Sequence, residues 1–193
     1  MRYHAGHSES TRKRIVQHAA RRFRASGLTP GIGKLMQEVG LTHGGFYAHF
    51  SSKNHLIRAA LVQAVEEMME RLFRAALRSP DRAFERLVLA YLHQSHCEEP
   101  EKGCTLPSLA AEISRQDEEV RDEFTVLLKR MIEAIEGISL HVPEKERREH
   151  TLMVLSTLSG SVMLARAVSD PALQQAFLDS ARNVLLRPFR RPE

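Results

Sequence analysis

Apolar residues recur with helical spacing along almost the whole chain, and this periodicity limits the possible folds more than any other feature. Residues 118–137 show it clearly, with a continuous apolar stripe made by Val120, Phe124, Leu127, Leu128, Met131, Ile132 and Ile135. No segment has the sustained alternation of apolar and polar residues that a half-buried strand requires. We therefore predict an all-α protein of about nine helices.

Start and stop signals divide this pattern into separate helices. The first is expected to begin near Ser8 or Ser10 and to stop at Gly27, because serine favours an N-cap and glycine a C-terminal stop. Residues 98–103 are expected to form a loop. The other predicted helices cover residues 32–39, 42–49 and 53–78, a segment after Ser79-Pro80-Asp81, residues near 107–115 and 118–137, residues 152–168, and a last segment after Asp170-Pro171.

The chain has 193 residues, enough for one domain of ordinary size or two small ones. The longest uncharged stretch in its apolar C-terminal part, residues 151–165, is too short and too polar to span a bilayer. The N-terminus has no apolar stretch of the kind found in signal peptides. With only two cysteines, the chain is expected to be cytoplasmic and to keep both thiols free.

Positive charge is concentrated in the first third of the chain. Residues 1–60 hold ten Lys and Arg against two acidic residues, whereas the rest of the chain is net acidic. Lys and Arg that meet phosphates release counterions on binding, so this asymmetry favours a polyanion-binding head on a body with another task. A solvated basic helix face is the alternative interpretation.

Residues 31–50 consist of a predicted short helix, a turn containing glycine and a second short helix, which is the order of a helix-turn-helix. The sequence from Gly40 to Leu56, GLTHGGFYAHFSSKNHL, resembles the TetR family of transcriptional regulators. The resemblance rests on twelve positions: Gly40, Leu41, Thr42, His43, Gly44, Gly45, Phe46, Tyr47, Ala48, His49, Phe50 and Lys53.

The resemblance implies that the second short helix enters the major groove of double-stranded DNA at one half of a palindromic operator. The residues implied in DNA contact are His43, Gly44 and Gly45 at the base edges, Thr42, Tyr47, His49 and Lys53 at phosphates, and, more weakly, Lys34, Arg12 and Arg14. For each side chain the alternative is plain solvent exposure or, for Tyr47, a packed core ring. Four residues are assigned to the core of this region: Phe23, Leu35, Phe46 and Phe50.

The body also resembles the family, through Gly103-Cys104 with LPSLAAEIS and through GSVMLARAVSDP from Gly160 to Pro171. These segments are similar to a branch that includes repressors of electrophile-detoxifying enzymes. The resemblance implies a DNA-binding domain over residues 1–55, an effector-binding and dimerisation domain over residues 56–193, and a homodimer formed by the last two long helices. Four small residues would allow close helix approach there: Ser156, Ser159, Gly160 and Ser161.

The two cysteines are the candidate sensors of an effector or oxidant. Cys104 directly precedes a predicted helix, and the helix dipole is expected to lower the pKa of its thiol. The alternative is that Cys104 is a small buried hydrophobe. His93, His96 and Cys97 could form a metal cluster with Cys104, but no further ligand has a signature spacing, so no metal and no cofactor are predicted.

These features predict a DNA-binding regulator, most simply a repressor that a small molecule or thiol modification releases from its operator. One alternative is a helical small-molecule carrier or adaptor that keeps the head without operator binding. A weaker alternative is a thiol-dependent enzyme that uses Cys104. No catalytic site is predicted, because the sequence has no serine-histidine-aspartate pattern, phosphate loop or paired carboxylates.

Overall fold

The computed structural model describes residues 3–189 and confirms the all-α prediction, since this range contains nine α-helices and no strand. The α-helices are α1 (Tyr3–Ser26), α2 (Ile32–Glu38), α3 (Lys53–Leu77), α4 (Ala83–Tyr91), α5 (Gln94–Glu98), α6 (Thr105–Ile113), α7 (Glu118–Ile138), α8 (Arg147–Ala167) and α9 (Pro171–Leu185). Short 3-10 helices are η1 (Gly44–Ala48), η2 (Pro80–Arg82), η3 (Pro100–Lys102), η4 (Glu144–Glu146) and η5 (Arg187–Phe189).

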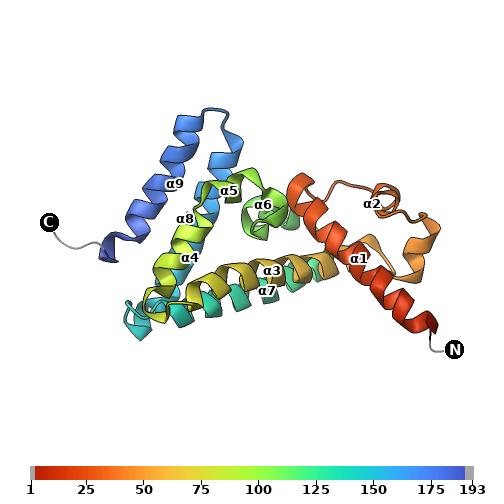
Figure 1. Cartoon of the computed structure of the whole chain (residues 1–193), viewed down its shortest axis with the longest axis horizontal. Helices are drawn as coiled ribbons and strands as arrows, with labels where there is room; N and C mark the ends of the chain where they lie inside the picture. The colour runs from red at the N-terminus through yellow and green to blue at the C-terminus, as the bar shows by residue number, and fades with distance from the viewer. Residues whose placement is uncertain (1–2, 190–193) are drawn as a thin grey trace.

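Helices α1 and α2 form a head at one end of the long axis of the molecule (Figure 1). The four residues predicted for its core are all buried: Phe23, Leu35, Phe46 and Phe50. Glu38 of α2 also reaches α1, where its carboxylate lies 2.7 Å from Nε2 of His18 and 3.4 Å from Nε of Arg22. Apolar packing and these surface contacts together fix α2 against the basic face of α1.

The turns in the head follow the predicted signals, with one exception at the N-terminus. Gly27 and Gly40 both have φ of 73°, a left-handed conformation that favours glycine and ends a helix. Ser52 caps α3 by accepting a hydrogen bond from the His55 N–H. However, α1 begins at Tyr3 rather than near Ser8 or Ser10, because the residues before Ser8 continue the helix instead of breaking it.

In the body, the long helices α3 and α7 run side by side, and α8 pairs with α9 (Figure 1). Asp170 caps α9, as its position before Pro171 predicts. Helix α3 has an apolar stripe that is buried throughout: Leu56, Ala60, Leu61, Val65, Met68, Leu72 and Ala76. Burial of such a stripe is what stabilises a helix of this length in a globular protein.

One segment differs from the prediction. The expected loop at residues 98–103 contains the 3-10 helix η3, which begins two residues after the end of α5. Helix α8 begins at Arg147, so the polar segment at residues 139–149, for which the sequence allows a loop or a charged helix start, supplies the first residues of this helix. Within the described range, no helix combines the length and the hydropathy that crossing a membrane requires.

Candidate nucleic-acid interface

The predicted recognition helix over residues 42–49 is a single 3-10 helix, η1, rather than a regular α-helix. Glycines at its first two positions disfavour α-helix and leave a short, tight turn. The Thr42 side chain still has the capping role predicted for it, because its Oγ1 accepts a hydrogen bond from the Gly45 N–H at 3.3 Å. Residues 42–49, called the recognition segment below, therefore expose backbone as well as side chains.

Two buried phenylalanines fix the orientation of this segment. Phe46 and Phe50 stack with ring centroids 5.4 Å apart and are at most 1 % exposed. Their burial turns the next residue, Tyr47, outward, so that 59 % of it is exposed. The Tyr47 ring makes edge contacts with Phe46 at 5.2 Å and with His43 at 5.8 Å. Tyr47 is thus a surface residue and not the core ring of the alternative interpretation.

The remaining predicted contact residues lie around Tyr47 with differing exposure. Thr42, His43 and Gly44 are exposed, whereas Gly45 and His49 are half-buried. Lys34 is exposed on α2. The turn and η1 therefore bring the residues of the motif together on one short segment, next to a lysine from the preceding helix.

Lys53 has a partner that the sequence does not reveal. Its Nζ donates a hydrogen bond to the backbone carbonyl of Leu28 at 2.6 Å. The N–H of Leu28 in turn donates to Oε2 of Glu112 in α6 at 2.7 Å. Lys53 therefore ties the loop between α1 and α2 to the start of α3, and only its remaining N–H groups are available to a phosphate.

The two weaker candidates on α1 also make intramolecular contacts. The guanidinium of Arg12 lies 5.0 Å from the centroid of the Phe50 ring, within the range of a cation–π interaction. Arg14 donates to the carbonyl of Val39 at 3.3 Å from an exposed position. Both side chains keep further donors that face solvent, so their basic charge remains part of the head surface.

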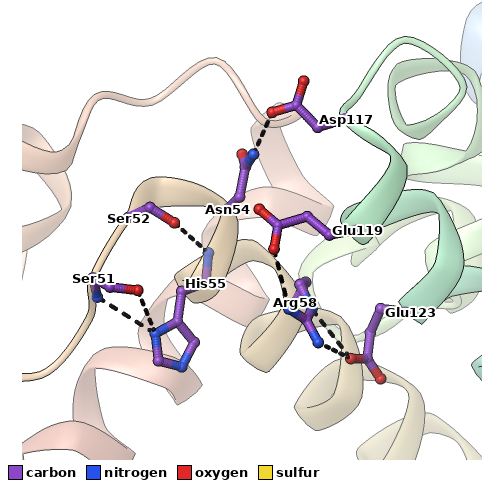
Figure 2. A network of polar contacts seen from close by, with 8 residues as sticks. All are labelled: Ser51, Ser52, Asn54, His55, Arg58, Asp117, Glu119 and Glu123. Atoms are coloured by element: carbon purple, nitrogen blue, oxygen red, sulfur yellow. Dashed lines mark hydrogen bonds and ion pairs between the residues drawn. The ribbon is translucent and has the colours of Figure 1, made fainter.

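The start of α3 is joined to α7 by a polar network, in which Arg58 points toward two carboxylates (Figure 2). Asn54 Nδ2 donates to Asp117 at 2.5 Å, and Arg58 contacts Glu119 at 3.2 Å and Glu123 at 3.3 Å. The sequence does not predict this network. The acidic run at the start of α7 is visible in the sequence, but nothing along the chain shows which basic residue faces it.

Arg24 forms a second, buried connection between the head and the body. It lies on α1 and is 3 % exposed. Its guanidinium pairs with Glu67 at 2.8 Å and donates to the carbonyls of Ala64 at 3.2 Å and Gly103 at 3.4 Å. Removing one partner of such a buried pair leaves an uncompensated charge, so Arg24 holds α1 firmly against the body.

Cys104 occupies the N-cap of α6, as predicted, but its thiol is not activated. Its Sγ accepts a hydrogen bond from the Leu106 N–H, and the residue is 1 % exposed. Burial raises the pKa of this thiol above its ordinary value, which contradicts the lowering expected from the helix dipole. Loss of solvation outweighs the favourable N-terminal field, so Cys104 is protonated at neutral pH.

Cys97 is half-buried, and burial also raises the pKa of its thiol. Both cysteines are free. His96 uses both ring nitrogens, one toward the Tyr91 carbonyl at 2.6 Å and one accepting from the Cys104 N–H at 2.8 Å. No group of three His, Cys, Asp or Glu between residues 3 and 189 is arranged to hold a metal ion.

Comparisons with known proteins agree on one architecture. A TetR-family regulator from Cytophaga hutchinsonii superposes with a TM-score of 0.78 at 17% identity, covering 94% of this chain and 96% of its own. One from Agrobacterium tumefaciens gives 0.77 at 20% identity, over 93% and 98%. The reduced form of E. coli NemR gives 0.75 at 19% identity, over 92% and 96%. The chain has the TetR-regulator fold. No protein-family model and no curated protein sequence matches it.

The TetR-regulator fold extends over head and body alike, since each of these structures covers more than nine-tenths of the chain. The motif that carries the sequence resemblance, Gly40 to Lys53, forms the turn, η1 and the first residue of α3 in this fold. The motif thus lies on the surface predicted to meet DNA.

Proposed function

We propose that the chain is a homodimeric DNA-binding transcriptional regulator, most simply a repressor, that acts in the cytoplasm and has no catalytic activity. The observation that carries this proposal is Tyr47, a ring left largely exposed on a segment anchored by two buried phenylalanines. The ring contacts Phe46 and His43 only at its edge, and its hydroxyl can donate to a phosphate. The excess of Lys and Arg in residues 1–60 supplies the complementary charge.

We assign base contacts to His43, Gly44 and Gly45, because they begin the recognition segment and leave its backbone accessible. Phosphate contacts are assigned to the polar residues around them, namely Thr42, Tyr47, His49, Lys34 and Lys53. Of these, Lys53 acts partly through its bond to Leu28, which positions the loop beside the recognition segment. The DNA-binding domain ends at residue 55, within the first turn of α3.

Dimerisation is assigned to α8 and α9. These helices leave large apolar side chains exposed at 43% to 53%, namely Leu152, Met153, Met163, Leu164, Leu173 and Val184. Their spacing on α8 confines them to one side of that helix. A second copy of the chain is the simplest cover for such a surface, and it places two heads on the two halves of a palindrome.

Residues 56–193 are the proposed effector domain, and its body offers two ways to sense a signal. An apolar cavity of about 330 Å³ lies between α6, α7 and α8, and its lining includes Leu128 together with Leu152 and Met163 of the proposed dimer surface. The proposed sites of thiol modification are Cys97, which is half-buried, and Cys104, which a reagent can reach only when the fold around it opens. If Cys104 is the trigger, N-ethylmaleimide will release wild-type protein from DNA but not the Cys104→Ser variant. Release of both proteins would indicate that Cys97 or the cavity, and not Cys104, senses the signal.

Two head variants test the assignment of the DNA contacts. Tyr47→Phe and Lys34→Ala each remove one donor from an exposed side chain, so both should fold normally and bind DNA about 3- to 10-fold more weakly. Lys129→Ala, an exposed lysine on α7, removes the same charge from the body and should leave affinity unchanged. Fluorescence anisotropy on operator DNA measures all three. Equal affinity for every variant would contradict the proposed contacts.

A further inference from the structure

A second cavity, of about 450 Å³, lies between α3, the segment from α4 to α5, and η3. Its polar lining comes mainly from Arg71 on α3, His93 and His96 around α5, and Glu99 and Lys102 at η3. A volume of this size suits a small-molecule ligand. The cavity lies outside the DNA-binding surface and shares none of its lining residues with the apolar cavity between α6, α7 and α8.

Arg71 is a cation without a direct partner in this cavity. Among residues 3–189 its guanidinium makes no ion pair and no hydrogen bond, although it presents five N–H donors. Partial burial and the nearby charge of Arg24 lower the pKa of Arg71, whereas the charges of Glu99 and Glu67 act in the opposite direction. Arg71 is an exposed residue, so its guanidinium can receive an anion that enters the cavity from solvent.

Glu99 is the carboxylate among the lining residues, and its charge stabilises that of Arg71 from a distance. Its Oε1 pairs instead with Nζ of Lys102 at 2.5 Å. His96 adds no negative charge, because burial, together with the charges of Arg166 and Arg71, lowers its pKa to about 4. The cavity thus keeps one net positive charge, and the fork-shaped set of donors on Arg71 matches a pair of oxygens on a carboxylate or a phosphate.

We propose that this cavity is a binding site for a small anion, a carboxylate or a phosphate, held by the guanidinium of Arg71 with Lys102 beside it. The site gives the effector of this regulator a chemical class, and in this respect it rests on the function proposed above.

The position of the cavity explains how such an anion could act on the head. The η3 segment that supplies Lys102 packs against α1. The next residue, Gly103, offers its carbonyl to the buried Arg24 of α1 at 3.4 Å. A side chain at Gly103 would collide with Arg166 and His96, so the segment is closely fitted on this side as well. A ligand that draws η3 toward Arg71 therefore changes the support of α1.

Isothermal titration calorimetry on the full chain without DNA tests the site, with succinate and inorganic phosphate as separate probes at constant ionic strength. We expect saturable binding of at least one probe, with one site per chain, and at least a tenfold loss of affinity in Arg71→Gln. Arg74→Gln is the matched control, because Arg74 lies on the same helix, is exposed and pairs with Glu70. This control should bind as wild type does.

The identity of the probe that binds distinguishes a carboxylate from a phosphate ligand. Binding of neither probe would overturn the proposal, and so would binding that Arg71→Gln leaves unchanged, since that result would point to the basic head. Hydrogen–deuterium exchange with the bound probe is expected to slow at residues 99–104 and to change in α1. An unchanged α1 would overturn the coupling. Because no DNA is present, these measurements test the anion site independently of whether the chain binds an operator.

Discussion

His96 is the residue whose ionisation has the largest expected effect on the body. It is 6 % exposed and accepts the Cys104 N–H at Nε2, so it must be neutral and carry its proton on Nδ1, toward the Tyr91 carbonyl. Burial is the main reason why its pKa falls to about 4, from 6.5 in water. Protonation would break the Cys104 contact and place a charge in the core beside Arg166.

The protein is therefore expected to lose stability as pH falls from about 6.5 to about 4. In that window the unfolded chain binds a proton at His96 and the folded chain does not, so the free energy of unfolding drops, by on the order of 3 kcal/mol in total. Urea denaturation at several pH values measures this loss. His96→Gln, which keeps a donor and an acceptor, should flatten the slope, whereas His43→Gln on the exposed head should not. An unchanged slope in His96→Gln would contradict this assignment.

The sequence predicted that Phe46 and Phe50 belong to the core, and it left Tyr47 open between a phosphate contact and a packed core ring. It could not predict the partners of Lys53 and Arg24, or that Arg71 lines a cavity. A basic residue that faces DNA, one that bonds a carbonyl and one that lines a cavity have the same local sequence. Only the packing of segments that are distant in the chain distinguishes these three kinds of basic residue. The same packing buries the Cys104 thiol and raises its pKa.

At the scale of elements, the glycines of the head have opposite roles. A Cβ at Gly44 would meet no neighbouring atom within 4 Å, whereas one at Gly27 would lie 2.2 Å from Glu112 Oε1, at a φ of 73°. Gly44 is thus free to accept a side chain as far as folding is concerned. In the proposed interface, the missing side chain would let the backbone approach DNA closely.

Substitution by alanine should separate these two roles. Gly44→Ala is expected to raise the free energy of unfolding slightly, by up to about 1 kcal/mol, and to weaken DNA binding. Gly27→Ala should destabilise the fold by about 1 to 3 kcal/mol, through the strained φ and the contact with Glu112. Thermal unfolding and anisotropy measure the two effects. If Gly44→Ala bound DNA as tightly as wild type, the recognition segment would not approach DNA through its backbone.

Helix boundaries were predictable where a cap or a positive φ fixed them, as at Gly27, Ser52 and Asp170. Helix boundaries were not predictable where neither a capping residue nor a positive φ marks the end of the helix. The predicted recognition helix is the 3-10 helix η1, and residues 100–102 of the expected loop form the 3-10 helix η3. The second difference matters for function, because η3 carries the charged side of the anion cavity.

For the whole molecule, the apolar surface of α8 and α9 makes the oligomeric state the property to test. Leu164 is 44% exposed on α8, and Leu164→Glu would place a charge in the proposed interface. We expect this variant to be monomeric by analytical ultracentrifugation and to bind an operator far more weakly. Leu140→Glu is the matched control, since Leu140 is 69% exposed outside both helices and its replacement should leave a dimer. A dimeric Leu164→Glu protein would place the interface elsewhere.

The central claim is that the basic head reads DNA. Its most direct test is fluorescence anisotropy of the purified chain on duplex DNA from immediately upstream of its own gene, against a scrambled duplex, at several salt concentrations. We predict preferential binding to the upstream duplex, weakening as salt rises and saturating at one dimer, or a pair of dimers, per palindrome. Equal, weak binding to both duplexes at every salt concentration would contradict operator recognition at this site and favour a carrier that has kept the regulator fold.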